Sequence, residues 1–417
     1  MNHKKVLNYE LFIARRLLSS KRYKSSVSSP IIKIAILAIS LGMVVMLISM
    51  ATSMGLQQKI REKISGFNGH IQLRNFDNNH SETTLVPLSK NQEFYPHFKQ
   101  VEGIQHVQVY ATKAGIIRTA TDFEGILLKG VAADYDSSFF EEYLVEGRWP
   151  DFRNGVSSEV LISREISNRM QLKLGDRFNV LFVKEDPNKP PWLRVLTVAG
   201  IYNSGFHDFD KAYVIGDLRH IQKMNRWTAE EVGGFELIID DFDTIEHTAD
   251  QVYVQTAATL NSTSIVEKYP AIMEWIRLFD NNTYVIIAIM ILVAGINMIT
   301  ALLVLILERT RMIGMLKAMG STNASVRKVF LYQAAYLIVK GLFWGNTLGI
   351  TLLLLQKHFH FIALNPETYY VNTVPVYIHL GYIIALNVGT LGLCILMLLL
   401  PSAVISKITP VKAIRFV

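Results

Sequence analysis

The chain has 417 residues, of which 50% are apolar and only 18% are charged, so it is too apolar for an ordinary soluble protein of this length. Its single cysteine, Cys394, lies in an apolar run, which excludes an internal disulfide and is typical of inert packing. The formal net charge of +7 comes from basic segments beside the apolar runs and does not indicate nucleic-acid binding.

The first elements expected along the chain are a cytoplasmic lead-in and a membrane-spanning helix. Residues 1–33 contain eight Lys and Arg residues, and the apolar positions within 6–18 have the spacing of an amphipathic helix on the inner leaflet. An ordinary cytoplasmic lead-in is the alternative. Residues 34–54 carry no charge and are long enough to cross a bilayer. Because no small-residue cleavage site closes this span cleanly, we expect a retained anchor and not a cleaved signal peptide.

Residues 55–282 are expected to form one large extracytoplasmic α+β domain, divided into two subdomains. Between residues 56 and 280 the chain has 24 basic and 32 acidic residues, a net charge of −8. Segments rich in β-branched or alternating apolar residues predict strands at 70–76, 107–120, 125–131, 177–183, 193–201 and 235–239. Helices are expected at 93–101, 164–171 and 243–260. The proline-rich stretch 184–192 is interpreted as a hairpin tip or loop.

Three more segments after this domain are apolar and long enough to span a membrane. They are residues 283–307, 329–355 and 376–404, which contain no Asp or Glu and whose only basic side chains are Lys340 and His379. The fold class expected is therefore an integral membrane α-helical protein with four transmembrane helices and a large α+β domain inserted between the first and the second.

The distribution of Lys and Arg gives the orientation. Besides residues 1–33, basic residues gather in the connection 308–328 and in the tail 405–417, whereas the loop 356–375 has only Lys357. The positive-inside rule therefore places both termini and the 308–328 connection in the cytoplasm, with the large domain outside.

The connection 308–328 is too short to form a domain and has one apolar helical face. Met312, Met315, Leu316 and Met319 recur at the spacing of that face, and Gly320 ends the predicted helix. An adaptable methionine face with basic flanks suits docking in a groove on a partner. On spacing alone, burial of the methionines in lipid is an equally good interpretation.

The third span carries two features that indicate packing and transport. Gly341, Gly345 and Gly349 lie four residues apart, and such a stripe lets helices approach closely within the bundle or across a dimer. A flexible span is the alternative. Lys340 lies about 16 Å into the bilayer at about 1.5 Å per residue, where a charge is costly. It either snorkels, faces a wet cavity or meets an anionic substrate, and its place beside the glycine stripe makes it a candidate for the substrate path.

Several kinds of chemical site are absent from the sequence. No Gly-x-x-x-x-Gly-Lys-Ser/Thr motif occurs, so any ATP hydrolysis must come from another polypeptide. No arrangement of nucleophile, histidine and carboxylate stands out. His358 and His360 lie close together but lack neighbouring ligands, which favours a surface loop over a metal site. We therefore expect a non-catalytic chain that holds no cofactor and no metal.

Short segments, in a fixed order along nearly the whole chain, are similar to those of a known family. They are residues 9–16, 71–73, 198–202 with Gly205 and Asp210, 234–237, 308–320, 365–371 with 374–376, and 410–415. Together they resemble the LolC/LolE type of lipoprotein-releasing ABC transporter permease. The segment 308–320 is similar to the coupling region of the wider FtsX-like superfamily, which has MacB-like relatives, whereas 365–376 is more specific to the lipoprotein releasers.

The resemblance implies a set of partners. Such permeases pair with a second permease copy or paralogue and with two copies of an ABC ATPase, which holds the ATP and Mg. Surrounded by membrane lipids in the inner membrane of a Gram-negative bacterium, the complex draws lipoproteins from the outer leaflet and passes them to a periplasmic carrier. Nucleic acid is not among these partners.

The resemblance also implies roles for particular residues. The ATPase-coupling residues would be Glu308, Arg309, Arg311, Met312, Met315, Leu316, Lys317, Met319 and Gly320. The carrier-docking loop would contain Pro187, Asn188, Pro190, Pro191 and Trp192. This loop is shorter than the hairpin by which LolC-like members hook the carrier. It is therefore open whether this subunit docks the carrier, binds the lipoprotein or does both.

Two other functions are alternatives to lipoprotein release. A MacB-like permease that transmits mechanical motion for efflux belongs to the same superfamily, but such chains usually carry a fused ATPase, which is absent here. An FtsX-like regulator of cell-wall enzymes transports nothing, and its outer domain is usually smaller than the one expected here.

Overall fold

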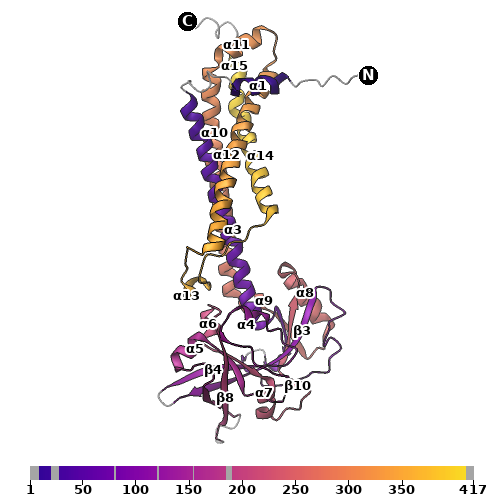
Figure 1. The fold of residues 1–417 in the computed structure, drawn as a ribbon. Coiled ribbons are helices and arrows are strands. Elements are labelled where there is room, and N and C mark those ends of the chain that lie inside the picture. Colours follow the sequence, from indigo (N-terminus) through magenta and orange to yellow (C-terminus); the bar gives the residue numbers. More distant parts are fainter. Residues whose placement is uncertain are drawn as a thin grey trace, which may run out of the picture. The chain divides into compact units, whose positions relative to one another are not determined.

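The computed structural model describes residues 9–19, 28–78, 81–119, 122–153, 155–184 and 190–409 (Figure 1). The chain forms two compact units. The membrane unit consists of Met1–Leu56, Ile276–Ile362 and Val374–Val417, and the outer unit consists of Gln57–Trp275 and Ala363–Thr373. Of the residues singled out above, 6–8, Pro187, Asn188 and 410–415 lie outside the described residues.

Four helices of the described chain are long and apolar enough to cross a membrane (Figure 1). They are α3 (Ser28–Asn68), α10 (Pro270–Glu308), α12 (Asn323–Phe359) and α14 (Leu380–Ser402). Shorter helices accompany them in the membrane unit: α1 (Tyr9–Ser19), α11 (Thr310–Ala318) and α15 (Val404–Lys407). Ser325 of α12 donates a hydrogen bond to Glu10 of α1 at 2.8 Å.

The fourth of these helices begins later than the sequence predicts. Residues 376–379 are not helical, and α14 starts at Leu380 rather than at 376. The backbone N–H of Tyr377 donates to the carbonyl of Ala51 in α3 at 3.0 Å, so this N–H is satisfied by a neighbouring helix and not by a helical turn of its own.

The glycine stripe of α12 lies directly against α3. A Cβ added to Gly341, Gly345 or Gly349 would lie 2.7, 2.6 or 2.9 Å from side-chain atoms of Ile39, Met43 and Leu47, respectively. These three α3 residues are themselves four apart, so two matched rows pack at close range. On another face of α12, Asn346 exchanges amide hydrogen bonds with Asn387 of α14 at 2.7 and 3.0 Å.

The outer unit is built on one large sheet flanked by short helices (Figure 1). In the described residues the strands run in the order β12-β1-β11-β3-β4-β9-β6-β8-β5, with β7 paired to both β3 and β8. Their bounds are β1 Ile71–Asn75, β3 Ile104–Arg118, β4 Phe123–Val131, β5 Leu144–Gly147, β6 Glu159–Ser163, β7 Arg177–Phe182, β8 Trp192–Tyr202, β9 Tyr213–Asp217, β11 Gly234–Ile239 and β12 Leu260–Ser264. A separate pair is formed by β2 (Leu88–Ser89) and β10 (Glu231–Val232).

The helices of the outer unit are short. They are α4 (Ser138–Glu142), α5 (Arg164–Met170), α6 (His207–Asp210), α7 (Leu218–Asn225), α8 (Ile245–Gln255), α9 (Ile265–Lys268) and α13 (Pro366–Tyr369), with single 3-10 turns at Phe76–Asn78 and Phe242–Thr244. Several of them begin with a side-chain cap, as where Ser163 accepts from the N–H of Ile166 in α5.

One expectation for this unit is wrong. Residues 93–101 form turns instead of a helix, because Pro96 lacks a backbone N–H and the rings of Phe94 and Phe98 stack 5.2 Å apart on the core. The division into two subdomains stays a prediction, and the long strand β3 pairs with β11, β4 and β7 within one sheet. The helix expected at 243–260 is shorter, and the chain enters β12 at Leu260.

The close packing of α12 on α3 predicts a specific sensitivity to one methyl group. We expect Gly345→Ala to lower stability by about 1–3 kcal/mol, because the new Cβ would lie 2.6 Å from the Cβ of Met43 and 2.7 Å from the carbonyl oxygen of Ser40. Thermal unfolding in mild detergent measures this change.

The matched control is Gly392→Ala in α14, where an added Cβ meets nothing within 4 Å. This substitution should leave the melting temperature unchanged or raise it slightly, since alanine favours the helix. Equal melting temperatures for the two variants would contradict the packing argument.

Candidate functional site

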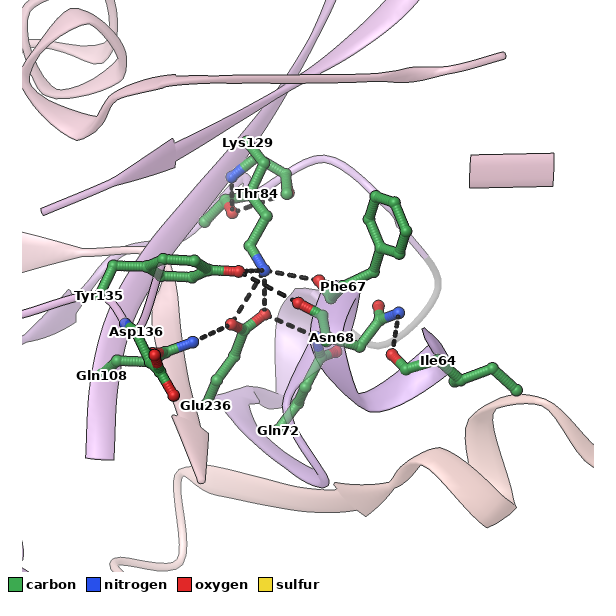
Figure 2. Close-up of polar contacts among 12 residues, drawn as sticks. Ile64, Phe67, Asn68, Gln72, Thr84, Gln108, Lys129, Tyr135, Asp136 and Glu236 are labelled. Carbon is green, nitrogen blue, oxygen red and sulfur yellow. Dashed lines mark hydrogen bonds and ion pairs between the residues drawn. The ribbon is translucent and has the colours of Figure 1, made fainter. Parts of the chain in front are cut away.

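A buried ion pair lies at the centre of the outer unit. Lys129 of β4 and Glu236 of β11 have side-chain exposures of 1% and 0%, and the ammonium nitrogen lies 2.7 and 2.9 Å from the two carboxylate oxygens (Figure 2). Burial lowers the pKa of Lys129, and the charge and hydrogen bonds of Glu236 oppose that change. A buried charge is stable only when its remaining hydrogen-bonding groups are also satisfied.

The hydrogen bonds that satisfy this pair reach the end of α3. The Lys129 ammonium also donates to the carbonyl oxygen of Phe67 at 2.6 Å, in the last turn of that helix (Figure 2). Tyr135 donates to the neighbouring carbonyl of Gly66 at 3.3 Å. Carbonyls in a last helical turn lack partners within the helix, and a cation is favoured there by the helix dipole. The pair therefore acts as a cap for the helix that continues the first span.

Two more strands complete the group, which we call the outer anchor and define as Phe67, Lys129, Tyr135 and Glu236 with the amides Gln72 and Gln108. Gln72 of β1 donates to one carboxylate oxygen of Glu236 at 3.3 Å, and Gln108 of β3 donates to the other at 3.0 Å. Four strands thus hold one helix end. The Phe67 ring adds apolar contacts, with its centroid 4.8–5.9 Å from those of Phe139, Phe140, Tyr202, Phe209 and Tyr213.

The start of α10 joins the same polar group through Asn68. The side-chain oxygen of Asn68 accepts hydrogen bonds from Lys268 at 3.2 Å and from the hydroxyl of Tyr269 at 3.0 Å. Lys268 also donates to Gln72 at 3.2 Å. Because Lys268 and Tyr269 directly precede α10, the outward ends of the first and second spanning helices share one hydrogen-bonded cluster.

At the other end of these helices, the predicted apolar face of α11 is divided. Met315 and Met319 are exposed at 53% and 73%, whereas Leu316 is buried in the bundle core together with Ile313. Leu316 is therefore not part of an exposed docking face, because it lies on the edge of the broad apolar stripe that packs on the bundle. Met312 is half-buried between the two groups.

The remaining residues of the 308–320 segment hold its shape. Lys317 donates to the carbonyls of Ile405 and Ile408 at 2.6 and 2.7 Å, which ties the segment to the end of α15. Gly320 has a φ of +95° and lies just after α11, and Thr322 caps α12 by accepting from the N–H of Ser325. Glu308 and Arg311 are exposed, and Arg309 is half-buried at the start of α11.

Lys340 lies on the surface of the bundle. Its side chain is exposed, and its ammonium nitrogen lies 4.6 Å from the centroid of the Tyr336 ring, one turn earlier in α12. Within this chain it therefore faces outward from α12 and not toward the bundle interior.

The hairpin between β7 and β8 carries exposed apolar residues. Pro190 and Pro191 are exposed, and the Lys184 ammonium lies 4.3 Å from the ring centroid of Trp192. In and beside this hairpin, Ile116, Leu181 and Leu193 stand in register on three paired strands, flanked by Phe123 at 80% exposure and by Val195. Leu181 is half-buried and the other four are exposed. We call these five residues the exposed apolar row.

The outer anchor was not recognised in the sequence, because its members are far apart and no local spacing marks them. The usable signal was a Lys and a Glu inside segments otherwise typical of buried strands, Leu128-Lys129-Gly130 and Phe235-Glu236-Leu237. A strand that is apolar on both faces is buried on both faces, so a charged side chain in it cannot reach solvent. Such a side chain therefore needs a buried partner of opposite charge.

Two known protein-family models match this chain, one in each half. Residues 34–268 match the model of the MacB-like periplasmic core domain, and residues 284–410 match that of the FtsX-like permease C-terminal region. The chain is 20% identical to the lipoprotein-releasing system transmembrane protein LolC of Neisseria meningitidis serogroup B, over 99% of this chain and 100% of that protein. It is 19% identical to LolE of Haemophilus influenzae, over 98% and 99% of the two chains.

Among solved structures, the periplasmic region of MacB from Actinobacillus actinomycetemcomitans matches 52% of this chain and 98% of its own, with 15% identity and a TM-score of 0.33. The resemblance to lipoprotein-releasing permeases seen in the sequence is confirmed by the two full-length matches.

The outer anchor predicts a large, non-additive effect of removing one charge. We expect Glu236→Gln to destabilise the protein by about 3–5 kcal/mol, because Lys129 would be left as a buried charge without a counter-ion. Adding Lys129→Met to this variant should recover a large part of the loss, as measured by thermal unfolding of the full chain in mild detergent.

The control is Lys211→Met, which removes an exposed ion pair with Asp208 and should change stability by less than about 1 kcal/mol. An effect of Glu236→Gln no larger than that of this control would show that the buried pair does not hold the helix end.

Proposed function

We propose that this chain is a permease subunit of an ABC transporter that releases lipoproteins from the inner membrane. The chain belongs to the MacB-like periplasmic core domain family and has an FtsX-like permease C-terminal region. The observation that carries the proposal is the end-to-end match to proteins named lipoprotein-releasing system transmembrane proteins, LolC and LolE. The efflux and cell-wall alternatives have no match of this extent among the relatives described above.

We propose that α11 receives a movement from a partner ATPase and that the outer anchor transmits this movement to the outer unit. Met315 and Met319 would dock in a groove on an ABC ATPase, while Leu316 and Ile313 join α11 to the bundle core. The ATPase would hold the ATP and Mg, and this chain would hold no cofactor. A shift of α3 or α10 along its axis would then act on the sheet through Lys129, Glu236 and Asn68.

The proposed arrangement in the cell follows the positive-inside rule, with both termini cytoplasmic and the outer unit in the periplasm. A second permease copy or paralogue would complete the transporter. Lys340, exposed on α12 at mid-span depth, is our candidate for contact with an anionic group of the substrate.

We further propose that the β7–β8 hairpin and the exposed apolar row meet a periplasmic lipoprotein carrier. Exposed apolar residues aligned on three neighbouring strands are typical of an interaction surface. The prolines of the hairpin restrict its conformations and lower the entropic cost of docking.

ATPase docking is tested with two exposed methionines. In proteoliposomes that contain the partner ATPase and a second permease, the wild-type chain should release a lipoprotein to its carrier when ATP is added. We expect Met315→Asp with Met319→Asp to lower ATPase co-purification at least about tenfold, because each new carboxylate must be desolvated in an apolar contact. Lipoprotein release should fall with it.

The matched control is Met315→Leu with Met319→Leu, which keeps the face apolar and should retain the ATPase. Normal co-purification of the Asp variant would rule out this docking face. A wild-type complex that hydrolyses ATP but releases no lipoprotein would instead argue against the proposed transport function.

The carrier surface is tested by site-specific photo-crosslinking in cells. A photoreactive residue at Pro191 or Leu193 should trap a soluble periplasmic protein, because these exposed positions lie in the hairpin and in the exposed apolar row. The same probe at Tyr253, exposed on α8, is the control and should trap little. Equal or stronger trapping at Tyr253 would assign the carrier to another surface.

A further inference from the structure

The loop between α12 and α14 folds onto the outer unit. We call residues Ala363–Thr373 the latch loop, and they belong to the outer unit although the spans on either side belong to the membrane unit. The loop closes on itself through a bridge between Ala363 and Thr373 and through a hydrogen bond from Leu364 N–H to the carbonyl of Asn372 at 2.9 Å. Its tip therefore has a defined shape.

Tyr370 at the tip of the latch loop contacts two other elements. Its ring stacks on Phe206 with the centroids 4.6 Å apart and an interplanar angle of 19°, and it meets the edge of Trp275 in α10 at 5.7 Å. Its carbonyl accepts a hydrogen bond from the ammonium of Lys63 in α3 at 2.8 Å. The residue has a φ of +59°, an uncommon value for a residue other than glycine.

The surface that receives the loop is a turn held by a buried carboxylate. Asp210 accepts hydrogen bonds from the hydroxyl of Ser204 at 2.6 Å and from the N–H of Gly205 at 3.0 Å. Burial raises the pKa of Asp210 to about 6 against these two bonds, which lower it. Gly205 has a φ of +68°, and a Cβ there would lie 3.1 Å from the side chain of Asn372. Glycine thus allows the loop to approach.

Apart from Phe206, the residues that contact Tyr370 lie on continuations of spanning helices. Lys63 lies in the helix that continues the first span, Trp275 in the helix that leads into the second, and Tyr370 itself lies in the loop that joins the third to the fourth. One residue therefore links the outward continuations of all four spans. A loop that served only to connect α12 and α14 would not require these contacts.

We propose that Tyr370 is a positioning residue that couples movement of α12 and α14 to the outer unit, so that ATP hydrolysis is converted into lipoprotein release. This inference rests on the proposed function for its transport readout. Its structural part, the seating of the latch loop on Phe206, Trp275 and Lys63, is independent of what is transported.

The test is Tyr370→Ala in the full complex with its ATPase, in proteoliposomes. We expect lipoprotein release per ATP hydrolysed to fall about tenfold, because two ring contacts of the latch are lost. ATP hydrolysis itself should stay within about twofold of wild type, since Tyr370 is remote from α11 in the sequence and in its contacts. Tyr370→Phe, which keeps the ring and the carbonyl, should behave as wild type.

The matched control is Tyr369→Ala, which removes the neighbouring ring. The centroid of the Tyr369 ring lies 6.3 Å from that of Trp275, so its loss should leave coupling intact. Hydrogen exchange gives a second readout. In Tyr370→Ala the amides of the latch loop should exchange at least about tenfold faster, because the loop is unseated, while those of β1 and β11 remain protected and show that the unit is folded.

Wild-type coupling in a folded Tyr370→Ala protein would overturn the proposal, as would a loss of coupling of equal size in Tyr369→Ala. If the wild-type complex hydrolyses ATP without releasing lipoprotein, the proposed function fails. The latch is then judged by hydrogen exchange alone, and unchanged exchange of the loop in Tyr370→Ala would overturn it.

Discussion

The structure of the outer unit depends on the ion pair between Lys129 and Glu236. Removing two charges from water is expensive, and well-packed apolar residues of similar volume would often be as stable. What the ion pair adds is direction, because its hydrogen bonds fix the Phe67 carbonyl relative to four strands. An apolar contact at this place would tolerate rotation or sliding of α3. In the mechanism proposed above, α3 moves the outer unit, and an end that cannot slip on that unit favours such a movement.

The two ends of the spanning helices differ in how far their contacts are buried. The outer anchor is closed and buried, whereas α11 divides its apolar residues between the bundle and an open surface. A permanent connection within one chain can be desolvated fully. The docking surface proposed on α11 must keep its apolar side chains few and adaptable, and methionine suits that requirement because its side chain is unbranched and flexible.

The sequence was informative where a local pattern carries the physics. The four spans are marked by long uncharged runs, and strands such as β3, β4 and β8 by alternating or β-branched residues. Strands β6 and β9 have five residues each and are largely buried on both faces, so they lack alternation and are not predicted. Strand β12 has one apolar residue, Leu260, and carries no strand pattern. The false helix at 93–101 followed spacing alone and disregarded Pro96. The burial of Leu316 could not be predicted, because a broad apolar stripe does not say which of its edges meets the bundle.

The site residues that escaped prediction are those whose meaning depends on tertiary contact. Lys129 and Glu236 lie 107 positions apart, and Lys63 and Tyr370 lie 307 apart. In the sequence, Gly205, Asp210 and the 365–371 segment are points of resemblance only. The structure supplies their physical reason, because Asp210 shapes the turn, Gly205 leaves room for Asn372 of the latch loop, and Tyr370 stacks on the neighbouring Phe206. Two separate parts of the resemblance, Gly205 with Asp210 and the 365–371 segment, are thus brought together in one contact of the folded chain.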